Sequence, residues 1–145
     1  MIVAKRTLIT LAALLVLSAC GGFRLDPPAP ARPIVIAGFE VVYSPEIPGD
    51  RQRLLDRTGV RAEMQRVLRL SYPAGAGPMV RVIITQFRSG RWGPTRMHAT
   101  AQVLDPQGNV LAQIEADSTT VNGASRGSLI RTVSQDCVNQ IARQL

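Results

Sequence analysis

The sequence predicts an α+β fold in which helices cover one face of a mixed four-stranded sheet. Two runs, residues 34–45 and 78–87, are rich in β-branched residues and too continuously apolar to have a wet face, which is typical of central strands. Apolar residues recur at helical spacing between these runs and again near the C-terminus, and two alternating segments flank a turn at residues 104–111. The predicted order is β-α-β-β-β-α, a two-layer domain with two helices on one face.

The first helix is predicted over residues 58–70, where apolar side chains share one face and arginines the other. Thr58 is a candidate N-cap. Residues 50–57 could extend this helix by two turns, although Gly59 argues for a break. A strand, a helix and a second strand in this order predict a right-handed crossover and parallel pairing.

The clearest local signal is the turn LDPQGNVL, residues 104–111. Pro106 suits a φ of about −65°, and Gly108 suits the positive φ that a three-residue hairpin loop requires. The two arms alternate, so we expect one face in the core and one in water. The residues predicted to face the core are Met97, Ala99, Ala101, Val103, Val110, Ala112, Ile114 and Ala116.

The closing helix is predicted from a stripe of apolar residues, with Ser125 or Ser128 as its cap. Cys137 falls on this stripe, and cysteine is among the most buried residue types, so we expect an unreactive core thiol. The stripe consists of Ile130, Val133, Cys137, Ile141 and Leu145.

The N-terminal segment has the three parts of a secretory signal peptide. Lys5 and Arg6 precede an apolar run over residues 7–17, and small residues lead up to Cys20. About eleven apolar residues rise only about 16 Å as a helix, well short of the roughly 30 Å hydrocarbon core of a bilayer. We therefore interpret residues 1–19 as a signal peptide that is removed.

The residues Leu17, Ser18, Ala19 and Cys20 resemble the lipobox of bacterial lipoproteins. The resemblance implies that the Cys20 thiol receives diacylglycerol, that a peptidase cuts before Cys20, and that the new amino group is acylated. Two or three chains at ~0.8 kcal/mol per buried methylene would anchor the protein stably in a membrane. Gly21, in place of aspartate, fits the sorting of enteric lipoproteins to the outer membrane, on its periplasmic side.

Residues 20–33 are predicted to be the lipidated cysteine and a proline-rich linker. Residues 21–33 contain four prolines and few large apolar residues, so their composition argues against folding. At about 3.1 Å per residue, an extended linker would hold the domain up to roughly 40 Å from the bilayer. We expect the folded domain to span residues 34–145.

The chain is strongly basic, with a net charge of +7 and a pI near 11.0. Removal of residues 1–19 takes away two of the 17 basic residues and none of the 10 acidic ones, which leaves +5. This excess indicates anionic partners such as phospholipid, lipopolysaccharide, peptidoglycan or nucleic acid. We expect no nucleic-acid partner.

The residues that could carry chemistry form no catalytic or metal-binding pattern. The pattern places His98 and Cys137 on opposite sides of the sheet, and Glu115 and Asp117 share a strand face that is typical of solvated carboxylates. No spacing suits a metal, and no glycine-rich loop leads into a helix to bind phosphate. We therefore expect no cofactor, no metal and no enzymatic activity.

The remaining feature is the connection between the second and third strands, FRSGRWGPTR, where Arg88, Arg91, Trp92 and Arg96 surround two glycines. Tryptophan and arginine are typical of interface hot spots and of lipid-headgroup contacts. The alternative is that Trp92 folds back over the sheet edge while the arginines solvate the loop. We take these four residues as a candidate partner contact.

The predicted order on a proline-linked lipoprotein resembles small α/β envelope domains of unknown function and, more distantly, ABC-transport auxiliary lipoproteins and TolB amino-terminal-like domains. The resemblance rests on element order and on the hairpin residues Leu104, Asp105, Gly108, Val110 and Leu111. The resemblance implies a role in binding or assembly in the envelope rather than in catalysis, and it identifies no site residues. We expect a membrane-anchored, periplasm-facing lipoprotein with an envelope protein, lipid or cell-wall partner. The alternative is a lipid-binding accessory module of an envelope lipid-transport system, which would need an apolar cavity between the layers.

Overall fold

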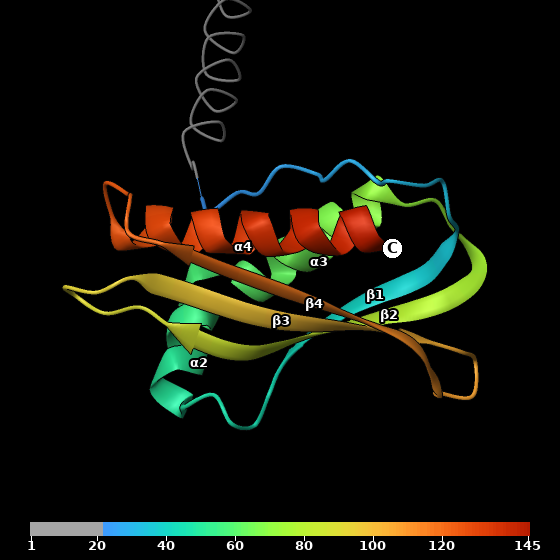
Figure 1. Ribbon diagram of the computed structural model, residues 1–145, viewed down its shortest axis with the longest axis horizontal. Helices are drawn as coiled ribbons and strands as arrows, with labels where there is room; N and C mark the ends of the chain where they lie inside the picture. The colour runs from blue at the N-terminus through green and yellow to red at the C-terminus, as the bar shows by residue number, and fades with distance from the viewer. Residues whose placement is uncertain (1–21) are drawn as a thin grey trace, which may run out of the picture.

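The computed structural model describes residues 22–145, so the predicted signal peptide and Cys20 lie outside the described residues. The elements follow the order β-α-α-β-β-β-α, which confirms the α+β class and the mixed four-stranded sheet. Helices α3 and α4 pack side by side on one face of the sheet (Figure 1). The elements are β1 (Ile36–Tyr43), α2 (Gly49–Thr58), α3 (Val60–Ser71), β2 (Ala74–Arg88), β3 (Thr95–Leu104), β4 (Val110–Thr120) and α4 (Arg126–Gln144).

The strands lie in the order β1-β2-β3-β4, with β1 parallel to β2 and the other pairs antiparallel. The parallel pair confirms the predicted parallel pairing. β1 lies at an edge of the sheet, so the prediction that residues 34–45 form a central strand is wrong. β2 begins at Ala74, four residues before its predicted start, and passes very close to the chain that leads into β1. A Cβ atom on Gly77 would collide with the carbonyl oxygen of Val35, so this approach requires glycine.

The segment before α3 forms a helix of its own, one helix more than predicted. Gly59 has a φ of 83°, a left-handed value that favours glycine. Its N–H closes α2 on the carbonyls of Leu55 and Asp56, while its own carbonyl accepts the first bond of α3 from Glu63. Thr58 ends α2 and donates its hydroxyl to the α2 backbone, so the prediction that Thr58 caps α3 is wrong.

The hairpin between β3 and β4 is confirmed at its turn, where Gly108 has a φ of 86°. Its apolar face is buried only in part, because Val110 is 51% exposed and Ala112 is also exposed. The length of α4 explains why this end of the hairpin is exposed. The last turn of α4 ends beside Glu115, to whose carbonyl Gln144 donates, so the tip of the hairpin extends past the helix that covers the rest of the sheet.

Residues 22–33, which we name the strap, pack along the helices instead of forming a free linker. Leu25 is only 2% exposed and belongs to the main core. Backbone N–H groups of the strap donate to both helices, from Leu25 to Glu63 at 2.8 Å and from Ala31 to the carbonyl of Ala142 at 3.3 Å. The folded part therefore begins well before the predicted boundary at residue 34, and the strap adds a third layer over the helices (Figure 1).

Helix side chains cover both edges of the sheet. On the β1 edge, Gln65 accepts from the N–H of Val41 at 3.4 Å and Arg69 donates to a neighbouring carbonyl. On the β4 edge, the amide of Gln140 bonds both the N–H and the carbonyl of Asp117, at 3.1 and 2.7 Å. Open strand edges attract further strands. Because side chains cap both edges here, we expect a partner to bind at another surface of the domain.

Candidate functional site

The connection between β2 and β3, which we name the basic loop (residues 88–96), projects from one end of the sheet (Figure 1). Trp92 at its tip is 93% exposed, so the alternative that Trp92 folds back over the sheet edge is wrong. The guanidinium of Arg91 lies 5.9 Å from the centre of the Trp92 ring, within the range of a cation–π contact. The tip therefore presents an indole and a positive charge together.

Positive charge is concentrated at the base of the basic loop. Arg88 and Arg96 are directly opposite partners on β2 and β3, an arrangement of like charges that destabilises a sheet. Arg96 donates to the hydroxyl of Thr119 at 2.9 Å. Within residues 22–145, no carboxylate forms an ion pair with Arg88, Arg91 or Arg96. An anionic partner would relieve this repulsion.

The first turn of α4 holds the base of the basic loop. Arg126 donates to the backbone carbonyl of Ser89 at 2.7 Å and approaches its hydroxyl at 3.3 Å. Of the two predicted caps, Ser125 and Ser128, Ser125 caps α4: its hydroxyl accepts from the N–H of Ser128 at 3.1 Å. The loop therefore has a fixed base and a free tip. Sequence reasoning missed Arg126, because no periodic pattern links a helix start to a loop 37 residues earlier.

The strap joins the domain on the same helix. Arg131 donates to the carbonyl of Arg24 at 2.7 Å and to the carboxylate of Asp26 at 3.3 Å. The amide of Gln135 bonds both backbone groups of Asp26, at 2.8 and 2.9 Å. Arg126 and Arg131 are five residues apart, or about 7.5 Å along a helix axis. The start of the strap and the base of the basic loop are thus attached to neighbouring turns of α4.

The outer face of the sheet brings together residues that sequence reasoning left apart. The hydroxyl of Thr85 lies 2.6 Å from Nδ1 of His98, whose Nε2 lies 3.3 Å from the carboxylate of Glu115. Thr85 reaches this row because β2 has an irregularity between Ile84 and Gln86. Although hydroxyl, imidazole and carboxylate stand in the order of a nucleophile relay, the Glu115 side chain is about half exposed on an open sheet face. We interpret the row as a cross-strand hydrogen-bond network.

Cys137 is a core thiol, as predicted. It is fully buried beneath the sheet, and its Sγ lies 3.8 Å from the carbonyl of Met97. Burial, with smaller contributions from the carboxylates of Asp117 and Asp136, raises the pKa of Cys137 to about 12. The thiol therefore stays protonated at neutral pH, and the sheet separates it from His98.

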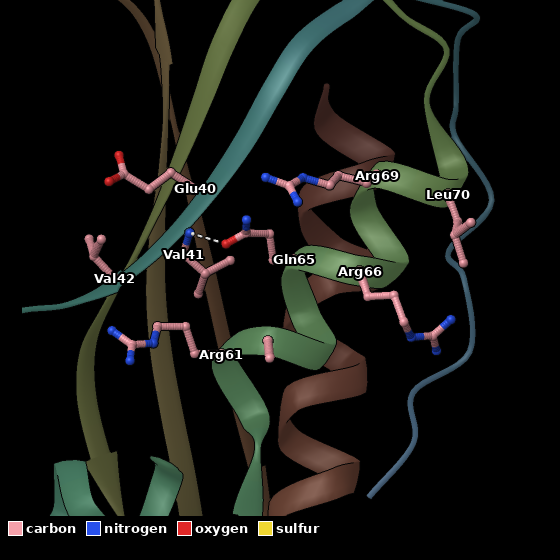
Figure 2. Close-up of a pocket in the computed structure, with 9 residues that line it drawn as sticks. Glu40, Val41, Val42, Arg61, Gln65, Arg66, Arg69 and Leu70 are labelled. Atoms are coloured by element: carbon pink, nitrogen blue, oxygen red, sulfur yellow. Dashed lines mark hydrogen bonds between the residues drawn. The ribbon is translucent and has the colours of Figure 1, made fainter.

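A groove of about 640 Å³ lies between the β1 edge and α3 (Figure 2). Its arginines already have partners: Arg61 pairs with Asp56 at 3.4 Å, and Arg66 pairs with Glu63 at 2.6 Å. Arg69 points at β1, as Figure 2 shows, and donates to a backbone carbonyl there. The side chains that line the groove therefore cap the sheet edge, and they offer little unpaired charge to a ligand.

The space between the sheet and α3 and α4 is filled, since the side chains that line it are fully or almost fully buried. A hollow of about 410 Å³ lies at the end of α4, lined by apolar residues such as Ile36, Val103 and Ile114 and by polar ones that include Arg32. Among residues 22–145, no cluster of three His, Cys, Asp or Glu side chains could hold a metal ion. No helix in this part of the chain is long and apolar enough to cross a membrane.

Comparison with known proteins gives distant matches among solved structures. No family model matches the sequence, and no curated protein matches it. A PelC variant from Paraburkholderia phytofirmans, crystallised as a dodecamer, is 13% identical with a TM-score of 0.47, over 83% of this chain and 95% of that chain. A second PelC dodecamer from this organism is 12% identical with a TM-score of 0.45, over 81% and 94%. A neuraminyllactose-binding hemagglutinin homolog from Helicobacter pylori is 9% identical with a TM-score of 0.29, over 83% and 85%.

None of these three structures is an ABC-transport auxiliary lipoprotein or a TolB-like protein, so those resemblances stay predictions. Their TM-scores lie below 0.5, and they carry no argument about the function of this chain.

Proposed function

We propose that this chain is a bacterial lipoprotein, anchored in an envelope membrane through acylated Cys20, whose domain faces the periplasm and binds an envelope component without catalysis. The outer membrane is the favoured location. The observation that carries the binding role is the 93% exposure of Trp92 at the tip of the basic loop. The anchor is supported by the sequence pattern that ends at Cys20.

The basic loop suits binding because its side chains add little to folding. A fully exposed tryptophan forgoes the roughly 1.5–3 kcal/mol that burial of a large apolar side chain supplies. Arg88 and Arg96 face each other as like charges. A desolvated tryptophan or arginine anchor can contribute about 2 kcal/mol or more to binding. The exposed indole and the unpaired arginines of the basic loop are therefore available to a partner.

A second candidate is the lipid-binding accessory module, favoured by the apolar hollow of about 410 Å³ at the end of α4. This volume lies within the range of small-molecule sites, about 300–1,000 Å³. The candidate ranks second because the space between the sheet and the two helices is filled by side chains.

Replacing Cys20 with alanine tests the anchor. The full chain is expressed in a Gram-negative host with labelled palmitate, and membranes are washed with carbonate. We expect the unmodified chain to carry label and stay with the membranes, whereas Cys20→Ala carries no label and accumulates as an uncleaved precursor. Cys137→Ala is the matched control, because that thiol is fully buried, and it should keep the label. Palmitate on Cys20→Ala would refute the proposed anchor.

A further inference from the structure

The strap leaves little chain between Cys20 and the folded domain. Hydrogen bonds with the Arg131 and Gln135 side chains of α4 hold the backbone of Arg24 and Asp26, and Leu25 between them is buried. Cys20 precedes Arg24 by four residues, and four residue steps span at most about 14 Å whatever their conformation. An acylated Cys20 would therefore hold this side of the domain within about 14 Å of the bilayer surface, not at the roughly 40 Å that a free linker allows.

The same end of the domain carries the basic loop. Arg131 binds the strap at Arg24, and Arg126 binds the loop at Ser89, about 7.5 Å apart along the helix axis. Trp92 follows Ser89 by three residues, a reach of at most about 11 Å. The attachment of the strap and the base of the basic loop therefore lie at the same end of α4.

The charge of this end fits a headgroup layer. The side chains of Arg24 and Arg131 are 70% and 50% exposed; Arg24 lies 4.0 Å from the carboxylate of Glu63, and Arg131 lies 3.3 Å from that of Asp26. The three arginines of the basic loop have no carboxylate partner among the described residues. Exposed arginines are attracted to anionic lipid surfaces, and tryptophan concentrates at the level of the headgroups.

We propose that the basic loop rests in the headgroup layer of the same bilayer that holds acylated Cys20, with Trp92 at the membrane interface and its arginines against lipid phosphates. This inference rests on the proposed lipid anchor. The domain then has two points of attachment, the acyl chains and the loop, which together fix its orientation on the membrane.

Trp92 is the only tryptophan of the chain, so its fluorescence reports the loop directly. The full-length acylated protein is reconstituted into vesicles of phosphatidylethanolamine and phosphatidylglycerol. We expect blue-shifted emission, quenching by lipids brominated near the top of their acyl chains, and acrylamide quenching severalfold weaker than that of free tryptophanamide. Changing Arg88, Arg91 and Arg96 together to serine should reverse all three results. Arg143→Ser, in the last turn of α4, is the matched control and should not.

The outcomes separate this inference from the proposed function. If Cys20 is acylated and the protein stays in the vesicles, but Trp92 is quenched by acrylamide and not by brominated lipid, the loop does not touch the bilayer. The inference would then be wrong and the anchor would stand, leaving the loop to a protein or cell-wall partner. If mass spectrometry of the same preparation shows Cys20 without acyl chains, the proposed function and this inference both fail.

Discussion

Replacing Leu25 with alanine should lower the free energy of unfolding by about 2–3 kcal/mol. The side chain is 2% exposed and lies in the main core, beneath a backbone that bonds to Glu63 and Arg66 of α3. Alanine keeps those backbone bonds and removes only the buried side chain, so the loss reports packing. Denaturant unfolding of the full-length protein in detergent, followed by circular dichroism, measures the effect.

Ala29→Ser is the matched control, because Ala29 lies in the same strap and is exposed. It should change stability by no more than about 0.5 kcal/mol. A Leu25→Ala protein that unfolds at the same denaturant concentration as the control would show that the strap is a free linker after all.

Replacing Glu63 with glutamine should cost about 1.5–3 kcal/mol at neutral pH, the usual value of hydrogen bonds to a charged group. The carboxylate is 8% exposed. It accepts from Arg66 at 2.6 Å and from the N–H of Leu25 at 2.8 Å, so it joins α3 to the strap. The Arg66 guanidinium, and secondarily the Leu25 N–H, hold the pKa of Glu63 below its ordinary value of 4.5 against the opposing effect of burial.

The lowered pKa of Glu63 fixes the direction of a pH effect. Below 4.5 the unfolded chain binds the proton first, so the stability from this carboxylate is complete above that pH and is lost as pH falls through the lower folded pKa. Unfolding free energies measured from neutral pH down to about pH 3 should therefore converge for the unmodified protein and Glu63→Gln. Glu40→Gln, at an exposed ion pair with Arg81, is the control. Parallel curves for Glu63→Gln would contradict this account.

Periodicity predicted the parts of the fold that repeat along the chain. Alternation placed Met97, Ala99 and Ala101 in the core, and all three are fully buried. The turn around Gly108 was predictable because its positive φ is a local requirement. The proline-rich composition of the strap predicted a free linker. The strap packs because Leu25 is buried and because distant helices bond to its backbone, and local composition shows neither of these.

The candidate site was predictable in composition and not in geometry. The sequence indicates Arg88, Arg91, Trp92 and Arg96 as a group, but whether an indole in an aperiodic loop packs or projects depends on the surfaces around it. The hydrogen-bond network of Thr85, His98 and Glu115 forms because the register of β2 shifts at Thr85, and the residue alternation along β2 does not reveal this shift. The link from Arg126 to the loop depends on how α4 crosses the sheet, a tertiary property.

The proposed function requires that the mature chain begins at a lipidated Cys20, and the mass of its N-terminal peptide shows whether it does. Trypsin cuts after Arg24, so the purified mature product should release the peptide CGGFR, residues 20–24. We expect this peptide to carry diacylglycerol on the Cys20 sulfur and an acyl chain on its amino group, with residues 1–19 absent. A peptide that still includes leader residues, or that begins at Cys20 with a free thiol, would show that Cys20 is not a lipid anchor.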